Sequence, residues 1–284
     1  MLVNINSEFG KLTNVLVAST AGYIRGDIPT SKNNPTCMFF SGDKRPLLAD
    51  LINEQNMFFD ILKKHSVQLT FSTLLENASA QVFTRDIAFV IGNKLFISNM
   101  KQPSRRKERE GISNILKEIE NEIIEVPSDI FLEGGDVIVC GKTIYIGEGL
   151  RTTKQAISFL KEQLDQSYKI IPIKLKKNML HLDVVFTVVD DNLAIVYPNG
   201  IYKRSLEQIK KSFEFIEIDK DEQFSLGTNV FCIDKKTVVV QKQHTHIIKE
   251  LRKRNFNVEI VDFSQMSKRG GALRCTTCPL FREE

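Results

Sequence analysis

Paired blocks of apolar residues along the chain predict β-hairpins. Each pair consists of two short apolar runs of strand length, separated by two or three polar or glycine residues. Glycine, asparagine and aspartate occupy these turns, and all three tolerate the positive φ that tight hairpins require. We therefore expect four hairpins, at residues 88–97, 137–146, 184–197 and 230–240.

Helical patterns separate these hairpins. Apolar residues at i, i+3, i+4 and i+7 form the buried stripe of an α-helix. The stripes consist of Leu48, Leu51, Ile52, Phe58, Ile61 and Leu62; of Ile112, Ile115, Leu116, Ile119 and Ile123; of Ile157, Leu160 and Leu164; and of Ile247, Ile248 and Leu251. Short β-rich runs follow at 67–71, 123–126, 170–175, 213–218 and 258–261.

These elements make up a ββαβ unit of about 46 to 48 residues that occurs five times. A supersecondary unit repeated at such a period predicts a solenoid, an array or a propeller. With strands inside and helices outside, five units predict a closed ring: an α/β fold of the five-bladed β/α propeller type. Residues 11–18 would begin the first blade, and the C-terminal strand would close the ring beside them. The alternative is an ordinary α/β sheet with coincidental spacing. We expect residues 1–284 to form one domain.

Composition and charge exclude several classes of function. Hydrophobic residues make up 42% and charged residues 26%, which is ordinary globular usage, and a net charge of +4 is small for a nucleic-acid-binding protein. No run of about eighteen apolar residues predicts a membrane span, and the N-terminus does not resemble a signal peptide. Five scattered cysteines do not form a disulfide framework. We expect a reduced, cytoplasmic protein without nucleic-acid or membrane partners; a homo-oligomer stays open.

Polar residues recur at one position of the repeat. Asp86, Glu133, His181, Asn229 and Cys275 follow one another at steps of 47, 48, 48 and 46 residues. Equal steps place equivalent residues at equivalent points, which in a ring is one end of the central axis. We therefore expect two carboxylates, a histidine, an amide and a cysteine to converge there. For Asn229, the alternative is that it only caps the fourth-blade turn.

The residue types in this set indicate the charge of the substrate. A cysteine with a nearby histidine is typical of nucleophilic catalysis. Nearby carboxylates raise a thiol pKa and disfavour the thiolate, unless a cationic substrate compensates. A guanidinium presents paired N–H donors in a rigid plane, matches carboxylates bidentately and stays protonated at ordinary pH. We therefore interpret Cys275 as the nucleophile of a hydrolase that attacks a guanidinium carbon.

Four segments, in this order, resemble the guanidine-modifying enzymes (penteins): arginine deiminases, dimethylarginine hydrolases, agmatine deiminases and amidinotransferases. The segments are Phe-Thr-Arg-Asp at 83–86, Leu-Glu-Gly-Gly-Asp at 132–136, His-Leu-Asp-Val-Val-Phe-Thr at 181–187 and Arg-Cys-Thr-Thr-Cys-Pro-Leu at 274–280. The likeness covers nearly the whole chain. It is strongest to arginine deiminase, whereas the chain length is closer to that of a dimethylarginine hydrolase. It implies a five-bladed propeller that uses neither a cofactor nor a metal.

The resemblance implies a role for each catalytic residue. Cys275 would be the nucleophile, and His181 would be the general acid for the departing amine and then the base for water. Asp86 and Asp183 would each hold guanidinium nitrogens, and Glu133 would share that task and orient the reacting group.

The resemblance also implies how the rest of the substrate is bound. Arg105 and Arg151 resemble the arginines that grip the substrate α-carboxylate. Arg269 resembles a mobile-loop arginine near the nucleophile, with a solvated loop charge as the alternative. Ala80 stands where family members usually place Asn or Asp for the amino-acid end, so Asn77 or Gln81 would have to replace that contact.

Several reactions stay open within the superfamily. Asp86 and Asp183 together favour an unsubstituted guanidino group, and paired arginines argue against agmatine. The leading prediction is conversion of arginine and water to citrulline and ammonia through an S-amidino intermediate on Cys275. The alternatives are an amidinotransferase, a dimethylarginine hydrolase, an arginine dihydrolase and an inactive amino-acid-binding propeller. The Cys275-x-x-Cys278 pair also fits a redox pair or half of a metal site.

Overall fold

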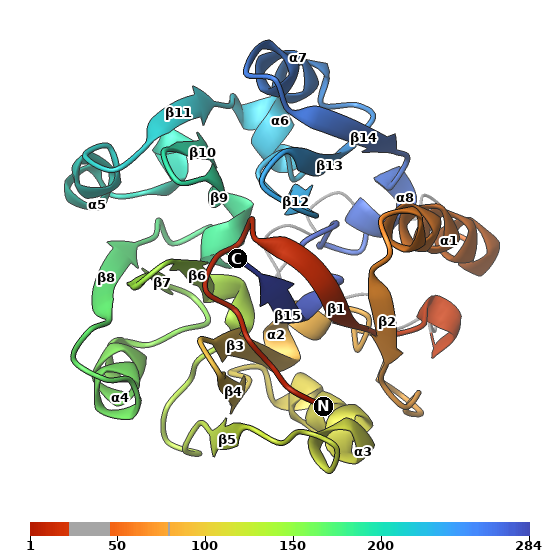
Figure 1. Ribbon diagram of the computed structural model, residues 1–284, viewed down its shortest axis with the longest axis vertical. Helices are drawn as coiled ribbons and strands as arrows, with labels where there is room; N and C mark the ends of the chain where they lie inside the picture. The colour runs from red at the N-terminus through yellow and green to blue at the C-terminus, as the bar shows by residue number, and fades with distance from the viewer. Residues whose placement is uncertain (23–45, 79) are drawn as a thin grey trace.

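The computed structural model describes residues 1–22, 46–78 and 80–284. Five three-stranded sheets surround a central axis, and helices lie on the outer rim (Figure 1). The ring confirms the expected five-bladed β/α propeller, in place of one continuous α/β sheet. One domain over 1–284 stays a prediction, and Cys37 lies outside the described residues.

Each blade has an inner, a middle and an outer strand. The inner strand is antiparallel to the middle strand, which is parallel to the outer one. The blades are β15 (Cys278–Glu283), β1 (Lys11–Val17) and β2 (Gln68–Phe71); β3 (Ala88–Ile91), β4 (Lys94–Ile97) and β5 (Glu122–Glu125); β6 (Val137–Cys140), β7 (Thr143–Glu148) and β8 (Lys169–Lys174); β9 (Phe186–Asp190), β10 (Leu193–Val196) and β11 (Glu214–Glu217); and β12 (Phe231–Cys232), β13 (Thr237–Gln241) and β14 (Asn257–Val261). The predicted hairpins and outer strands are therefore present.

The two ends of the chain close the ring. β15 pairs with β1 in antiparallel register, from Lys11 opposite Glu283 to Leu16 opposite Cys278. The segment before β1 crosses the ring in front of the inner strands (Figure 1), where Ser7 forms an isolated bridge with the end of β6. The predicted closure by the C-terminal strand is confirmed.

The inner and middle strands form because their apolar runs are buried on both faces. Every residue of β3 and β10 is buried, as expected for strands enclosed between neighbouring blades and helices. Each fully buried aliphatic side chain of this kind stabilises the fold by about 1.5–3 kcal/mol. Gly92 (φ 56°) and Gly141 (φ 58°) provide the left-handed conformation in two hairpin turns.

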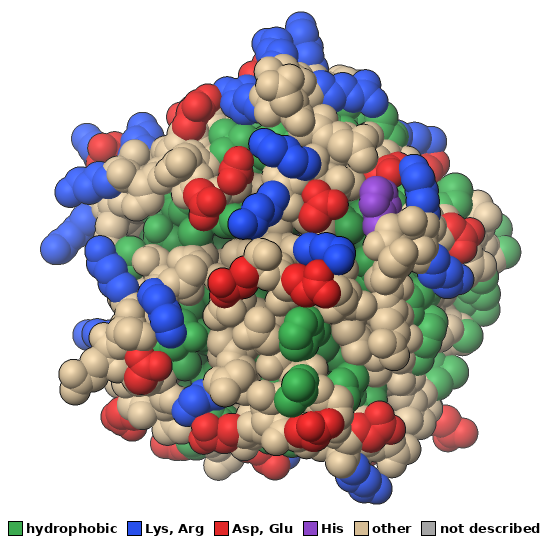
Figure 2. Space-filling model, in the orientation of Figure 1, with side chains coloured by type: hydrophobic (Ala, Val, Ile, Leu, Met, Phe, Trp, Pro, Cys, Tyr) green, Lys and Arg blue, Asp and Glu red, His purple; other side chains and the backbone are tan. Residues whose placement is uncertain are grey.

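The rim helices each bury part of their surface. They are α1 (Leu48–Lys64), α3 (Ser113–Leu116), α4 (Lys154–Gln163), α5 (Lys203–Ile209) and α7 (Thr245–Lys253). In α1, the predicted stripe residues Leu51, Phe58 and Leu62 are fully buried. Across the ranges that the structure describes, no helix is long and apolar enough to cross a membrane. Acidic and basic side chains are scattered over the face shown in Figure 2.

The prediction of one α-helix from Ile112 to Ile123 is wrong. The 3₁₀ helix η4 (Pro103–Ile112) ends at the first residue of this region, and the α-helix that follows ends at Leu116. Ile123 belongs to β5 instead, paired with Leu95 of β4. The helical period of this stripe was coincidental, because its last member packs as a strand residue.

Short turns connect each unit to the next inner strand. α2 (Thr84–Ile87), η5 (Gly134–Asp136) and η6 (Leu182–Val184) directly precede β3, β6 and β9. The remaining short elements are η1 (Thr20–Gly22), η7 (Pro198–Gly200), α6 (Lys220–Phe224) and α8 (Ser264–Ser267). These turns carry the polar residues of the recurring position to the axis of the ring.

Candidate active site

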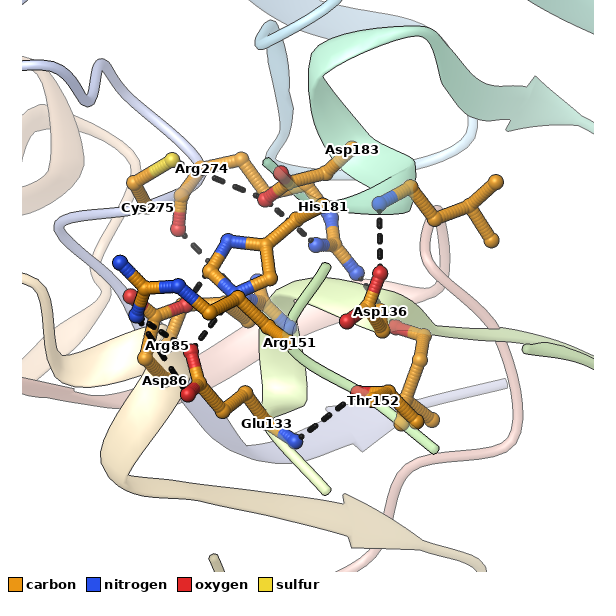
Figure 3. Close-up of polar contacts among 12 residues, drawn as sticks. Arg85, Asp86, Glu133, Asp136, Arg151, Thr152, His181, Asp183, Arg274 and Cys275 are labelled. Atoms are coloured by element: carbon orange, nitrogen blue, oxygen red, sulfur yellow. Dashed lines mark hydrogen bonds and ion pairs between the residues drawn. The ribbon is translucent and has the colours of Figure 1, made fainter. Parts of the chain in front are cut away.

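The five residues of the recurring position precede the five inner strands. Asp86 is in α2, Glu133 and His181 are the residues just before η5 and η6, Asn229 precedes β12 and Cys275 precedes β15. All five side chains are buried, and four of them are drawn together in Figure 3. The structure thus brings the predicted set together, while the catalytic roles stay predictions.

His181 lies between two carboxylates. Its Nε2 is 2.7 Å from Glu133 Oε2, and its Nδ1 is 3.7 Å from Asp86 Oδ1. Burial opposes a charge on the imidazole, but Asp86, Asp136 and Glu133 outweigh it and raise the pKa of His181 to about 9. Burial also opposes the charge of Glu133, yet the hydrogen bond from His181 and the charge of Arg151 help lower its pKa to about 2. An imidazolium and a carboxylate therefore coexist at neutral pH.

This arrangement requires glycine at position 135. A Cβ on Gly135 would lie 2.8 Å from both Asp86 Oδ1 and His181 Nδ1, closer than real Cβ contacts come. The backbone of η5 thus passes directly beside the imidazole. We infer that the Gly-Gly pair of the motif provides room for the histidine.

Cys275 is held as a neutral thiol in the free protein. Its Sγ lies 3.1 Å from Asn229 Nδ2 and 3.7 Å from Asp183 Oδ2. Burial raises the pKa of the thiol well above its ordinary value, and the charges of Asp183 and Asp86 raise it further. Added positive charge at this position would therefore favour the thiolate.

A buried chain of charges holds Asp183. Arg274 Nη1 donates to Asp183 Oδ2 at 3.0 Å, and Arg274 Nη2 donates to Glu8 Oε1 at 3.0 Å. Figure 3 shows the Arg274–Asp183 pair. Because Arg274 immediately precedes Cys275, the segment before β1, the nucleophile segment and η6 are tied together by one ion-pair chain.

Three buried carboxylate oxygens have no hydrogen-bond donor within the described part of the chain: Asp86 Oδ1, Asp183 Oδ1 and Asp136 Oδ2. The two that belong to the predicted guanidinium contacts are Asp86 Oδ1, which lies 3.7 Å from His181 Nδ1, and Asp183 Oδ1. A buried acceptor without a partner costs about 1–3 kcal/mol, so such groups need an explanation. The other oxygen of each carboxylate is bound by an arginine, Arg105 at 2.7 Å for Asp86 and Arg274 at 3.0 Å for Asp183. The free oxygen of each carboxylate can therefore still accept a hydrogen bond.

The two predicted carboxylate-binding arginines face carboxylates of the protein itself. Arg105 donates to Asp86 and also grips both oxygens of Glu108, at 2.8–3.1 Å. Arg151 Nη1 lies 3.3 Å from Glu133 Oε2. Both are buried beside the candidate guanidinium site, so the structure places them near the site without showing what they bind in a substrate.

Arg269 is buried rather than solvated. Its side chain is 3% exposed, and its guanidinium carbon lies 5.7 Å from the centre of the Phe83 ring. The solvated-loop interpretation is therefore wrong. Gly271 also packs against this ring, which brings the segment before Cys275 onto the Phe-Thr-Arg-Asp turn.

Gln81 does not replace the contact to the substrate's amino-acid end that Ala80 lacks. Gln81 is buried and donates to Ser72 Oγ at 3.2 Å and to the carbonyl oxygen of Thr73 at 2.6 Å. Its amide is thus used to hold the preceding loop. The carbonyl oxygen of Ala80 accepts a hydrogen bond from Arg105 Nη2 at 3.4 Å, so this position contributes through its backbone.

The site offers ligands for a cation. Within the described ranges, three side chains each place one possible ligand atom within 4.8 Å of the other two: Asp86, Glu133 and His181. Such a set fits a divalent metal and an organic cation equally. Cys278 does not extend this set, because its Sγ faces the carbonyl oxygen of Ala88 at 3.1 Å while Cys275 faces Asn229.

Sequence reasoning missed several residues of the site. Asn229 was on the recurring position, but its contact with the thiol was not anticipated. Arg274 adjoins the nucleophile, yet nothing in the spacing gave it a partner. Glu8 and Glu108 lie outside the repeat position altogether, so no periodic signal could have identified them.

The fold is shared with solved structures of guanidine-modifying enzymes. The solved structure of SxtG, an amidinotransferase of the saxitoxin pathway of Microseira wollei, superposes with a TM-score of 0.85 at 21% identity, over 99% of this chain and 98% of that one. At that identity the likeness concerns the fold, and it confirms the five-bladed propeller of the superfamily.

Sequence relatives place the chain within that class. It belongs to the family described as N,N dimethylarginine dimethylhydrolase, eukaryotic, whose model matches residues 23–282. It is 34% identical to the uncharacterized protein YkgA of Bacillus subtilis over 98% of this chain and 95% of YkgA. It is 30% identical to the arginine deiminase of Listeria monocytogenes serotype 4a, over 84% of this chain and 67% of that enzyme.

Proposed function

We propose that this protein is a cysteine-dependent hydrolase of an unsubstituted guanidino compound of the arginine type. The observation that carries the proposal is the pair of buried, donorless oxygens, Asp86 Oδ1 and Asp183 Oδ1, in the site of Cys275. A planar guanidinium supplies N–H donors to both. Its positive charge also cancels the negative field that keeps the thiol protonated.

In the first half-reaction, the guanidinium makes Cys275 reactive. Cation binding lowers the pKa of the thiol, whose proton leaves to solvent. The thiolate forms a bond to the guanidinium carbon, and a π electron pair moves onto nitrogen. His181, protonated up to about pH 9, donates its proton to the departing nitrogen. The C–N bond breaks, ammonia leaves, and a thiouronium cation stays on sulfur.

In the second half-reaction, His181 changes role. The neutral imidazole takes a proton from water as the oxygen bonds to the thiouronium carbon. Collapse of the tetrahedral adduct breaks the C–S bond and expels the thiolate of Cys275, while the second water proton passes to solvent. The products are a ureido compound and ammonia. Glu133 holds the imidazole in place throughout, through the 2.7 Å contact at Nε2.

The substrate end groups follow from the same contacts. A guanidino nitrogen with two methyl groups has no N–H for Asp183, so an unsubstituted guanidinium fits better than asymmetric dimethylarginine. Arg105 and Arg151 lie at the site and would receive a substrate carboxylate. The family description and the arginine deiminase from Listeria support a guanidino substrate of the arginine class.

The proposal is tested by assaying a panel of guanidino compounds, with and without an added amine. We expect ammonia and the ureido product in equal amounts from arginine, lower kcat/KM for dimethylarginine and agmatine, and no turnover by Cys275→Ala. Amidino transfer to the added amine would instead define an amidinotransferase. Ornithine with two equivalents of ammonia would define a dihydrolase, and binding without turnover an inactive propeller.

A further inference from the structure

Asn229 contacts the nucleophile through both ends of its amide. Nδ2 donates to Cys275 Sγ at 3.1 Å. Oδ1 accepts the backbone N–H of Arg274 at 3.0 Å and that of Cys275 at 3.2 Å. The side chain is 1% exposed and comes from the neighbouring blade, 46 residues before Cys275. One residue therefore fixes both the backbone and the sulfur of the nucleophile.

The backbone partners determine which way the amide points. Nitrogen and oxygen of an asparagine amide are assigned from their hydrogen-bond network. Two backbone N–H groups can be satisfied only by the amide oxygen, since the NH₂ group has no acceptor capacity. The NH₂ group must therefore face the sulfur.

These contacts do not fit a simple turn cap. The side-chain hydrogen bonds of Asn229 within the described structure run to Arg274 and Cys275, in the segment that enters the next blade. The turn of its own blade is closed by the backbone, where Asn229 N donates to the carbonyl oxygen of Leu226. The capping interpretation therefore accounts for none of the side-chain bonds.

We propose that Asn229 is a catalytic residue whose amide stabilises the thiolate of Cys275 in both half-reactions, which rests on Cys275 being the nucleophile of the proposed hydrolase. In the first step the N–H bond favours the attacking thiolate. In the second step it favours the same thiolate as the leaving group. Fixed donors aimed at a developing negative charge are an effective form of catalysis in a buried site.

The electrostatics of the site support this role. Burial, Asp183 and Asp86 raise the pKa of Cys275, whereas a backbone hydrogen bond at Ala272 and the amide of Asn229 lower it. Asn229 therefore opposes the two carboxylates that the substrate guanidinium needs. The site can keep those carboxylates close to the sulfur because a neutral donor offsets part of their effect.

The test measures the pKa of Cys275 in Asn229→Asp, Asn229→Ala and wild type, without substrate. Asn229→Asp keeps an oxygen for both backbone N–H groups and replaces the donor with a negative oxygen. Asn229→Ala removes the donor without adding charge. Asn14→Asp, at a buried asparagine of β1, is the matched control for a new buried carboxylate elsewhere. The rate of alkylation at Cys275 by iodoacetamide is followed by peptide mass spectrometry as pH is varied.

We expect the apparent pKa of Cys275 to rise in the order wild type, Asn229→Ala, Asn229→Asp, with Asn14→Asp unchanged. Each unit of increase slows alkylation at pH 8 by about tenfold. A structural lesion would expose the thiol and move its pKa down toward the ordinary value, so a wild-type or lower pKa in both variants overturns the proposal. Alkylation needs no turnover. Failure of the proposed hydrolase activity would therefore leave this result interpretable on its own.

Discussion

Cys275 and His181 do not form a thiolate–imidazolium pair in the free protein, because the imidazole is charged but the thiol is neutral. The pKa of the thiol is raised by burial and two carboxylates, while the pKa of the imidazole is raised to about 9. At pH 7 the thiol is neutral and the imidazole is charged. The general acid is thus ready before substrate binds, whereas the nucleophile forms only when a cation fills the site.

At the same residue scale, the titration of His181 should be shifted far from that of an ordinary histidine. NMR of histidine-labelled protein should show one imidazole titrating near pH 9. In the substrate-bound enzyme, where the thiolate has formed, loss of this proton removes the general acid, so kcat should decline as pH rises through the pKa of His181 in that complex. Glu133→Gln removes a carboxylate that raises this pKa, so the titration and the alkaline limb should both move down by about one unit or more. His181 titrating at or below 6.5 in wild type would contradict the assignment.

Asp183→Asn tests the contact with the guanidinium. The amide turns a donor or a weaker acceptor toward the substrate, and a hydrogen bond to a charged group contributes about 1.5–3 kcal/mol. We expect kcat/KM for arginine to fall by about 10- to 100-fold and the pKa of Cys275 to fall, because Asp183 raises it. The exposed Asp129→Asn serves as the control. Unchanged kcat/KM in Asp183→Asn would remove this residue from the binding site.

At the scale of elements, strands were easier to predict than helices for a physical reason. Inner and middle strands such as β3 and β10 are buried on both faces, so they are continuous apolar runs bounded by turns. The helix α5 was not foreseen, because only Ser205 and Ile209 of its seven residues are buried and no stripe forms. The helix expected at 112–123 failed for the converse reason, since apolar residues of η4, α3 and β5 happened to share a helical spacing.

Two glycines in short turns should respond differently to alanine. Gly135→Ala places a Cβ 2.8 Å from Asp86 Oδ1 and His181 Nδ1, and a misplacement of catalytic groups by about 1 Å costs roughly 100-fold in rate. Gly141→Ala meets nothing within 4 Å but must hold φ near 58°, which costs about 1–2 kcal/mol of stability. We expect kcat to fall strongly in Gly135→Ala but not in Gly141→Ala. Urea unfolding measures the loss of stability in each variant. Full activity in Gly135→Ala would show that the close approach is relaxed.

At the scale of the whole molecule, the closed ring and the candidate site are held by the same buried ion pairs. Glu8, in the segment before β1, binds Arg274 next to the nucleophile, and Arg274 binds Asp183. The ring and its recurring residues could be predicted because they follow one period. Their charged partners could not, since Glu8 and Glu108 sit at positions where a solvated carboxylate looks the same in sequence.

Glu8→Gln should destabilise the protein strongly. Removing one partner of a buried ion pair costs about 3–5 kcal/mol, and Arg274 is 1% exposed. Glu283→Gln, which breaks the exposed pair with Lys11 across the same ring closure, should cost at most about 1 kcal/mol. Urea unfolding at pH 7 makes the comparison. Equal, small losses of unfolding free energy in the two variants would mean that the buried Glu8–Arg274 pair does not hold the ring.

The difference in unfolding free energy between wild type and Glu8→Gln should depend on pH with a definite sign. Burial opposes the charge of Glu8, but Arg274 and Arg85 lower its pKa from 4.5 to about 2. A carboxyl group with a depressed folded-state pKa stabilises the protein above its unfolded pKa and loses that effect as pH falls. The difference in unfolding free energy between wild type and Glu8→Gln should therefore be largest above about pH 5 and decrease between pH 4.5 and 2.

The central claim is that Cys275 forms a covalent bond to the guanidinium carbon of its substrate. Mass spectrometry of enzyme quenched in acid during turnover of arginine tests it most directly. The account predicts a labile adduct, with the mass of arginine less ammonia, on the peptide that contains Cys275, and none in Cys275→Ala. Turnover of arginine by Cys275→Ala, or an adduct on another residue, would contradict it.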